Sequence, residues 1–481
     1  MPSTTAMRQI KDLPGPRALP LVGNAFQVKL ASVHQDLERW AREFGPLYQI
    51  KMGRIQVLVI ANHELFAAVL RDRPNGFRRS PRITEIGIEM GLPQGLTSAE
   101  GEDWQRQRRM VMASFAPGHV RAYFPSLLKV TLRLQARWQK AARARESINL
   151  QADLMRFTVD AIAGLAFGKD INTLEAGEDV IQRHLDKVLP AVFRRVVSLV
   201  PYWRYFRLPA DRALEHSVAV IRATLLDFVA QARQRLIDAP ALRDKPRNLL
   251  EAMIVAADQP GSGLGDRQVV GNVLTMLLAG EDTTANTLAW MIHLLQRNPD
   301  ALLNAQKEVR ALAPDPASYS MEQMDQLIFL EACISETMRL KPVAPLMALQ
   351  ALRDTAVGDV AVPKETLIMG VLRHDSVSER HFQNPHAFEP QRWLVDAPQP
   401  RSAVARRAAM PFGSGPRMCP GRYLALLEMK MAMAMLLASF DIEAVDTPDG
   451  KEAQERMAVT MNPVGLSMRL RERSTHKNHK K

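Results

Sequence analysis

The stretch from Asp266 to Asn298 constrains the fold more than any other part of this chain. It keeps a helical pattern without an internal proline and is closed by Pro299. At 1.5 Å per residue, such a helix would run for roughly 50 Å, which is enough to cross a whole domain. The chain therefore has to build its core around one long helix.

The remaining pattern favours helices over strands. Leu13–Asn24 is too rich in proline and glycine for a helix and predicts an extended lead-in, whereas the alternation around Gly53 predicts a hairpin. Further helices are expected at Leu327–Leu340 and Tyr423–Ser439, and a loop at Asp258–Gly265. We expect a mainly α fold with small β-sheets, forming one domain over 1–481 with flexible ends at 1–12 and 470–481.

Charge and cysteine content indicate the cellular compartment and the kind of partner to expect. Two cysteines far apart in the chain make no disulfide framework, which favours a reducing compartment. The first dozen residues lack the apolar core of a signal peptide, and no segment is long and apolar enough to span a membrane, so a cytoplasmic protein is expected. The net charge of +12 is dispersed, and no nucleic-acid-binding motif accompanies it. An acidic protein partner fits this charge better than nucleic acid.

Cys419 stands in the segment PFGSGPRMCPGR, between a glycine-rich turn and a helix start. A sulfur at a helix N-terminus is favoured as a thiolate. A nucleophilic cysteine needs a histidine base, and a zinc site needs further ligands at short spacing; the local sequence supplies neither. A single thiolate is enough to hold a haem iron through one axial bond.

The same segment resembles the haem-binding signature of the cytochrome P-450 family. Phe412, Gly415, Arg417, Cys419 and Gly421 fit F-x-x-G-x-R-x-C-x-G at every specified position. The resemblance implies the haem-thiolate fold and haem b (iron protoporphyrin IX) as cofactor. It makes Cys419 the iron ligand, Arg417 a partner of a haem propionate and Phe412 a neighbour of the thiolate. The loop glycines at 413 and 421 join the predicted cofactor site.

A second constellation is ETMR, in which Glu336 and Arg339 lie three apart on one helical face and can pair. Alone, the pattern is typical of a surface ion pair. Beside FEPQRW it resembles the family's structural ion network, and the resemblance implies a buried triad of Glu336, Arg339 and Arg392. The predicted role of this triad is folding and haem retention.

AGEDTT, residues 279–284, places acid and hydroxyl groups in the middle of the long helix. It resembles the family's oxygen-activation stretch, where the helix widens beside the haem. The resemblance implies Asp282 and Thr283 as the acid–alcohol pair that delivers protons, with Ala279 and Gly280 against the cofactor.

WQRQR resembles the family's W-x-x-x-R, which implies that Trp104 and Arg108 reach the haem propionates. One departure stands out in MALQALRDT. Where many relatives carry a propionate-binding Arg or His, this chain has Leu349 or Gln350.

The resemblance predicts a monooxygenase that inserts one oxygen atom from dioxygen into a small hydrophobic substrate. Electrons from NADPH or NADH are expected to arrive through a separate ferredoxin or flavodoxin with its reductase. This partner would dock on the cations Arg106, Arg109, Arg422 and Lys430. A peroxide-driven hydroxylase and a haem-based sensor or carrier remain alternatives, although the intact Asp282–Thr283 pair argues against the peroxide-driven enzyme.

The substrate itself is not readable from the sequence. By resemblance, the pocket is lined around Ile83–Leu96 and by Ala279, Val343, Ala344, Leu346, Met347 and Met461, which are largely apolar. The segment Val196–Phe206 is interpreted either as a mobile entrance cover or as ordinary core.

Overall fold

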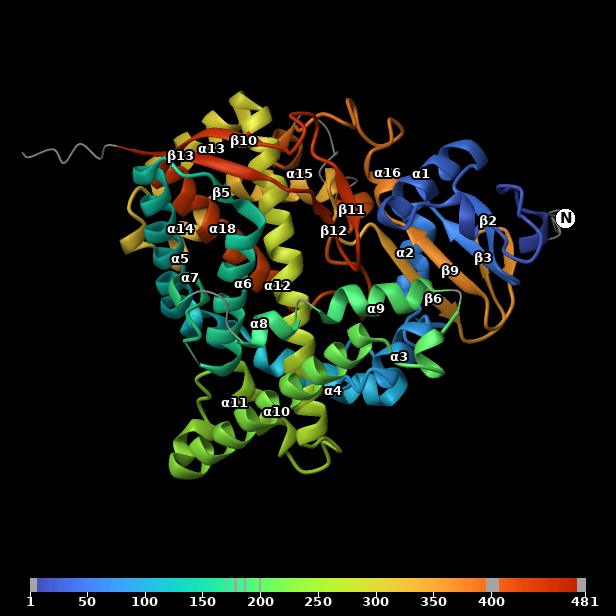
Figure 1. Cartoon of the computed structure of the whole chain (residues 1–481), viewed down its shortest axis with the longest axis horizontal. Helices are drawn as coiled ribbons and strands as arrows, with labels where there is room; N and C mark the ends of the chain where they lie inside the picture. Colours follow the sequence, from blue (N-terminus) through green and yellow to red (C-terminus); the bar gives the residue numbers. More distant parts are fainter. Residues whose placement is uncertain are drawn as a thin grey trace, which may run out of the picture.

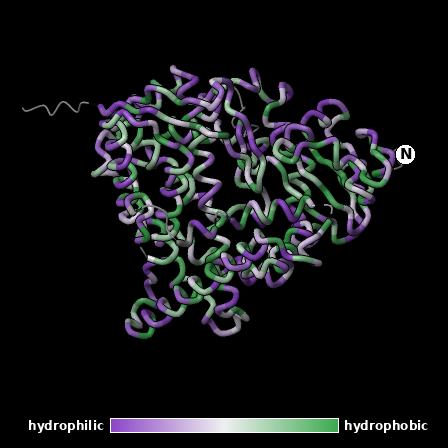
Figure 2. The backbone as a smooth tube through the Cα atoms, viewed as in Figure 1, coloured by the Kyte–Doolittle hydropathy of each residue, from purple (hydrophilic) through white to green (hydrophobic). Residues whose placement is uncertain are grey.

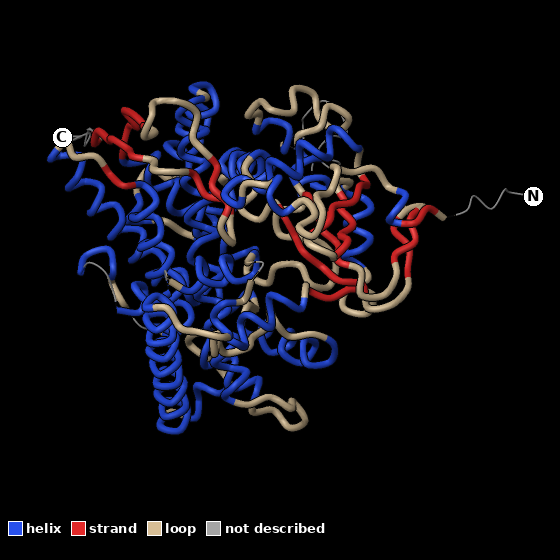
Figure 3. Tube along the Cα trace, turned by 45° about the vertical axis from the view of Figure 1, so that its right-hand side comes forward, coloured by secondary structure: helices blue, strands red, loops and turns tan. Residues whose placement is uncertain are grey.

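A computed structural model describes residues 7–168, 170–176, 180–185, 187–198, 200–394 and 406–473. Helices make up most of the molecule, and the larger sheet lies at the side that holds the N-terminus (Figures 1 and 3). The mainly α architecture with small β-sheets is confirmed.

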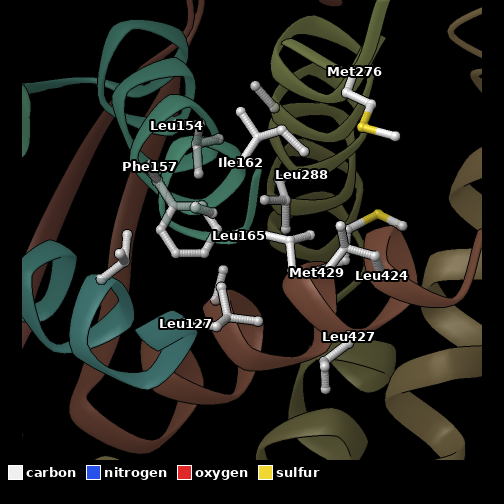
Figure 4. Close-up of a cluster of buried hydrophobic side chains, with 14 of the residues drawn as sticks. Leu127, Leu154, Phe157, Ile162, Leu165, Met276, Leu288, Leu424, Leu427 and Met429 are labelled. Carbon is white, nitrogen blue, oxygen red and sulfur yellow. The ribbon is translucent and has the colours of Figure 1, made fainter. Parts of the chain in front are cut away.

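The long helix is confirmed as α12, Asp266–Arg297, and it runs through the helical part of the molecule (Figure 1). It packs most extensively on α6, Leu150–Phe167. Figure 4 shows side chains of both helices meeting those of α5, Pro117–Ala144, and α18, Arg422–Ser439. These apolar contacts form the main core, so the helix that carries AGEDTT is held on several sides.

A five-stranded sheet with the order β2-β3-β9-β6-β4 forms the second layer. The predicted hairpin is confirmed as β2, Leu47–Met52, paired antiparallel with β3, Ile55–Ile60. β3 runs parallel to β9, Leu367–Val371, which pairs antiparallel with β6, Leu346–Ala351. The edge strand β4, Phe77–Arg79, pairs antiparallel with β6 and places Arg79 opposite Leu349.

Three smaller sheets complete the fold, and two of them order the chain ends. β1, Arg8–Gln9, pairs with β8, Val360–Val362, which also pairs with β7, Thr355–Val357. β13, Ser467–Glu472, lies between β10, Phe440–Asp446, and β5, Ile148–Asn149. β11, Glu455–Met457, pairs with β12, Met461–Pro463. The expected flexible ends are therefore too long, because strand pairing orders residues 8–9 and 470–472; residues 1–6 and 474–481 lie outside the described residues.

The other helices surround α12 and flank the larger sheet. They are α1 Val33–Phe44, α2 His63–Arg71, α3 Pro81–Glu89, α4 Gly101–Ser114, α7 Thr173–Ala176, α8 Val180–Leu185, α9 Val188–Val197, α10 Pro209–Asp238, α11 Leu249–Ala257, α13 Pro299–Leu312, α14 Met321–Gln326, α15 Ile328–Leu340 and α16 Arg373–Ser376. The helices expected at Leu327–Leu340 and Tyr423–Ser439 are confirmed as α15 and α18 within one residue, and the loop at Asp258–Gly265 separates α11 from α12.

Hydrophobic and hydrophilic residues are interspersed along most of the trace (Figure 2). In the described part of the chain, every helix is either too short or too polar to cross a lipid bilayer.

We predict that one buried acid makes stability fall as pH rises. Burial alone raises the pKa of Glu428, in α18, to about 8, whereas an unfolded glutamate titrates near about 4.3. The folded state disfavours the ionised carboxyl, so stability present below the unfolded pKa is lost as pH rises towards 8. Urea unfolding of Glu428→Gln should lack this decline, and the gap to the parent should widen by up to about 1.4 kcal/mol per pH unit.

Glu443→Gln is the matched control, since Glu443 is exposed on β10 and its removal should leave the pH profile of the parent unchanged. Parallel profiles for the parent and Glu428→Gln between about pH 5 and pH 8 would contradict the prediction.

Candidate active site

The Cys419 loop is shaped by two glycines and closed by one backbone hydrogen bond. Gly413 and Gly415 have φ values of 77° and 72°, which only glycine adopts without strain. A Cβ on Gly415 would lie 2.5 Å from the carbonyl oxygen of Leu70, so the loop packs directly on the end of α2. The amide of Cys419 donates to the carbonyl oxygen of Phe412 at 2.9 Å. The turn therefore presents the sulfur three residues before α18 begins.

Burial and charge act on the sulfur in opposite directions. Burial raises the pKa of the Cys419 thiol, while the Gly421 amide and the charge of Arg108 lower it by less. The helix-start environment expected to favour a thiolate is present, but desolvation is larger. Cys419 nevertheless retains accessible surface, and a Cβ on Gly421 would lie 4.0 Å from its sulfur. A bound cation would favour the thiolate form of this sulfur.

The central stretch of α12 divides its residues between two sides. Ala279 is exposed although α12 is buried along most of its length. A Cβ on Gly280 would lie 3.3 Å from the Ile162 side chain on α6, so this glycine allows close packing of α12 on α6. Residues 266–297 form one continuous α-helix without the expected widening. The Thr283 hydroxyl donates to the Ala279 carbonyl oxygen at 2.7 Å.

Asp282 is anchored to partners other than Thr283. Its Oδ1 accepts a hydrogen bond from the Asn286 amide at 2.7 Å, and its Oδ2 accepts one from the Thr460 hydroxyl. Burial raises the pKa of the Asp282 carboxyl, and the two hydrogen bonds offset part of that rise. The chain thus holds a partly desolvated acid next to the Thr283 position, with Thr460 as a partner that the sequence did not suggest.

A group of arginines lies beside the cysteine loop. The guanidinium of Arg417 stacks 4.6 Å from the Trp104 ring and donates to the Ala99 carbonyl oxygen at 2.8 Å. Arg417 also pairs with Glu100, whose carboxylate lies 3.7 Å from Arg73. The structure therefore brings the expected residues Arg417 and Trp104 together.

Two members of this group, Arg73 and Arg79, were missed by sequence reasoning. Burial first, and then neighbouring positive charge, lowers the pKa of Arg73 and of Arg417 to about 10. Burial also lowers the pKa of Arg79 and of Arg108. The Nε atoms of Arg73, Arg79 and Arg417 are buried and have no hydrogen-bond partner in the described part of the chain. The site is short of negative charge.

Strand pairing explains the departure noted at Leu349 and Gln350. Leu349 is buried, and Gln350 accepts a hydrogen bond from Arg78 at 2.9 Å. Arg79 lies opposite Leu349 in the β4–β6 pair, so the neighbouring strand supplies a cation at that level. The arginines of FRRS, residues 77–80, are visible in the sequence. Only the strand register shows that Arg79 lies opposite Leu349.

The ion triad is completely assembled. Arg339 contacts both oxygens of Glu336, at 2.7 and 2.8 Å, and Arg392 lies 3.0 Å from Oε1 of the same carboxylate. Glu336 and Arg339 are fully buried. Trp393 donates to Glu336 Oε2 at 2.8 Å, so no oxygen of this buried carboxylate lacks a donor.

Not every predicted site residue lies where it was expected. Met461 is fully buried in the main core and its amide donates to the Val343 carbonyl oxygen, so it lines no accessible pocket. Lys430 is also buried and pairs with Glu331, which removes it from the proposed docking cations. Val343, Leu346 and Met347 are half-buried and Ala344 is exposed.

The fold is mainly helical, and it places one cysteine in a tight loop beside several arginines that share the single carboxylate of Glu100. This combination fits the site of a haem-thiolate protein. A model of the cytochrome P450 family matches residues 13–470. The chain therefore belongs to the cytochrome P450 family, haem-dependent oxidoreductases.

Similar proteins include a mitochondrial 25-hydroxyvitamin D-1 alpha hydroxylase of Homo sapiens, 28% identical over 91% of this chain and 88% of its own. A chloroplastic carotene epsilon-monooxygenase of Arabidopsis thaliana is 26% identical over 91% and 81%. A self-sufficient cytochrome P450 monooxygenase of Exserohilum turcicum is 28% identical over 97% of this chain, which spans only 43% of that relative's length. The expected soluble bacterial type is not confirmed by these relatives.

The residues present fit haem, the cofactor of this family. Haem carries an iron that neutralises a thiolate and two propionate carboxylates that pair with guanidinium groups. The structure offers one exposed cysteine, Cys419, whose thiol pKa burial raises, and the Nε atoms of Arg73, Arg79 and Arg417, which are buried without an acceptor in the described part of the chain. The haem iron would stabilise the thiolate of Cys419, and the haem propionates would supply the acceptors that the arginine nitrogens lack.

We predict that breaking the triad strongly destabilises the fold. Glu336→Gln leaves two buried guanidinium groups facing a neutral amide, and removing one partner of a buried ion pair costs about 3–5 kcal/mol. Urea unfolding of the haem-loaded chain measures this loss. The exposed Arg8–Asp359 pair is the control, since Arg8→Gln should cost no more than about 1 kcal/mol. Equal losses at both sites would contradict a structural role of the triad.

Proposed function

We propose that this chain is a monooxygenase that inserts one oxygen atom from dioxygen into a small hydrophobic substrate. The observation that carries the proposal is the accessible Cys419 sulfur in a loop closed on Phe412 and flanked by buried arginines. The whole chain 1–481 would act as one haem domain, in a reducing cytoplasmic compartment that suits its two free cysteines.

Each side chain of the site has a distinct task in this proposal. Cys419 ligates the iron, Phe412 and Gly421 shape the space around the sulfur, and Arg417, Trp104 and Arg108 hold the propionates together with Arg73 and Arg79. When bound, haem supplies the redox chemistry that activates dioxygen, favoured by thiolate donation.

Proton handling falls to α12. Thr283 has a hydroxyl whose proton rests on the Ala279 carbonyl oxygen, so its lone pairs can accept a further hydrogen bond. The half-buried Asp282, whose pKa burial raises, can hold a proton and pass it on through Thr460 or water. An intact alcohol and acid favour an enzyme driven by dioxygen over one driven by peroxide and over a sensor without turnover.

The substrate is proposed to be apolar, because the residues expected to line its pocket and retaining accessible surface are apolar: Ala279, Val343, Ala344, Leu346 and Met347. Relatives named for vitamin D and carotene support a hydrophobic molecule. The entrance alternatives at Val196–Phe206 stay open: Trp203 is core and donates to Glu89, whereas Tyr205 and Phe206 are exposed, and Leu199 lies outside the described residues.

The proposed electron donor is a separate acidic carrier, a ferredoxin or flavodoxin reduced by its reductase with NADPH or NADH. Arg109 and Arg422 are exposed cations, and Arg106 is half-buried; Arg422 lies over the Phe412 ring at 5.8 Å, close to the cysteine loop. Opposite charges would guide the carrier towards this face.

Cys419→Ala tests the iron ligand. The ferrous carbonyl complex of the parent should show the red-shifted Soret band of thiolate ligation, and the variant should lose it because no sulfur remains at the loop. Cys333→Ala is the matched control: Cys333 is buried on α15, and its replacement should keep the band. A red-shifted band in Cys419→Ala would overturn the assignment.

Thr283→Ala tests the proton relay. General acid–base assistance is worth about 10²–10⁴-fold, so the variant should still consume NADPH but release hydrogen peroxide in place of product. Thr283→Ser, which keeps the hydroxyl, should retain most of the coupling. Asp282→Asn should slow turnover with a larger solvent isotope effect. NADPH, peroxide and product are measured in one reaction, and full coupling in Thr283→Ala would make the hydroxyl structural.

The docking face is tested by charge reversal. Arg109→Glu with Arg422→Glu should slow reduction by the acidic carrier, and raising salt should slow the parent, since the Debye length falls from about 10 Å at 0.1 M to about 3 Å at 1 M. Lys364→Glu, an exposed cation in the sheet region, is the control and should reduce at the parent rate. Insensitivity to both the reversal and salt would reject this face.

A further inference from the structure

Two histidines and one aspartate meet away from the cysteine loop, at the junction of the larger sheet with the segment after α16. His63 is the first residue of α2, Asp375 belongs to α16, and His381 follows in the next loop. One ligand atom from each lies within 4.8 Å of the other two. This is the one group of three or more potential metal ligands found among the described residues.

The three side chains are well enclosed and closely spaced. Their exposed fractions are 5% for His63, 7% for Asp375 and 12% for His381. His63 Nδ1 lies 2.8 Å from Asp375 Oδ2, and His381 Nε2 lies 3.6 Å from the same oxygen. The two imidazole rings meet edge to face, with their centroids 4.8 Å apart.

His381 shows that protein contacts alone do not complete this cluster. Its Nε2 is buried, and in the described part of the chain it has no hydrogen-bond partner. The 3.6 Å separation from Asp375 is too long for a hydrogen bond. A buried imidazole nitrogen directed at a carboxylate without bonding to it is costly unless something lies between them.

We propose that His63 Nδ1, His381 Nε2 and Asp375 Oδ2 bind a divalent transition metal ion, with Zn²⁺ as the best fit. Two imidazoles and one carboxylate suit zinc, whereas Mg²⁺ and Ca²⁺ prefer oxygen ligands throughout. Zinc–ligand bonds of about 2.0–2.1 Å in a tetrahedron place ligand atoms about 3.3 Å apart. The observed separations of 2.8 and 3.6 Å bracket that value. A water molecule would complete the tetrahedron.

A surrounding set of contacts already orients the ligands. The backbone amide of His63 donates to Asp375 Oδ2 at 2.8 Å, and His374 Nδ1 lies 3.6 Å from the other carboxylate oxygen. His374 is itself fixed by the Ala61 carbonyl oxygen at 3.1 Å. Such outer contacts orient metal ligands in known sites.

The ion would join two parts of the fold. α2 packs beneath the cysteine loop at Leu70 and Gly415, while Ser376 and Pro385, on either side of His381, accept hydrogen bonds from Arg339 of the triad. A metal here would connect the sheet side of the cofactor loop to the segment that the triad organises. Its role is structural, so the melting temperature should rise with the concentration of free zinc.

The test uses the haem-loaded full chain without a polyhistidine tag, stripped with EDTA and then titrated with zinc chloride. We expect one tightly bound zinc per chain by elemental analysis after gel filtration, a higher melting temperature, and zinc-edge X-ray absorption showing two nitrogen ligands from imidazole. His381→Ala should weaken zinc binding by at least about 10–100-fold. None of these readouts requires turnover, so they are independent of the proposed monooxygenase reaction.

His386→Ala is the matched control, since His386 is exposed on the same loop and should bind zinc as the parent does. Each variant's melting temperature is compared with and without zinc, because His381→Ala also removes the ring contact with His63. His63→Gln is a second test variant of the metal site. If it fails to fold, His381→Ala alone provides the test. No stoichiometric zinc in the parent, or equal affinity in parent and His381→Ala, would overturn the proposal.

Discussion

The carboxylate of Glu336 is the point on which the cofactor side of this structure depends. It is fully buried, and its desolvation is offset because Arg339, Arg392, Trp393 and the backbone amide of Glu389 all direct donors at its two oxygens. Nη1 of Arg339 donates to the carbonyl oxygens of Ser376 and Pro385, and Nη2, which also bonds Glu336, donates to that of Ala387. One ion pair on α15 thereby fixes the path of the irregular chain that precedes the cysteine loop.

The charges of the cofactor site, unlike those of the triad, are not balanced within the protein. The triad is internally balanced, whereas the arginines beside Cys419 outnumber the carboxylate of Glu100 that pairs with Arg73 and Arg417. Burial lowers the pKa of Arg73 and Arg417 and raises the pKa of Cys419, so it disfavours the charged form of each of these groups. Haem brings an iron and two carboxylates to these places, so cofactor binding and stability of this region are coupled.

The local sequence pattern was sufficient to predict elements that are encoded by consecutive residues. The α12 helix, the β2–β3 hairpin and the cysteine loop could all be predicted from short stretches. Arg79 could not, because its place opposite Leu349 is set by a strand pairing across 270 positions of sequence. Lys430 and Met461 were misplaced for a related reason: a helix or strand pattern does not say which side meets the core. The His63–Asp375–His381 cluster exists only after α2 and α16 meet.

The segment from α16 to the triad shows why polar contacts matter there. Its buried apolar cluster is small, with Phe382 and Ala408 as the buried members, whereas the main core joins most helices. Apolar burial is strong but non-directional, so it cannot by itself hold an irregular loop in one shape. Arg373, which contacts Glu38 and Glu455, adds a second buried ion cluster at the start of this segment. Ion pairs at both ends of this segment, together with the histidines between them, therefore fix the conformation of the loop before Cys419. Its small apolar cluster could not do so alone.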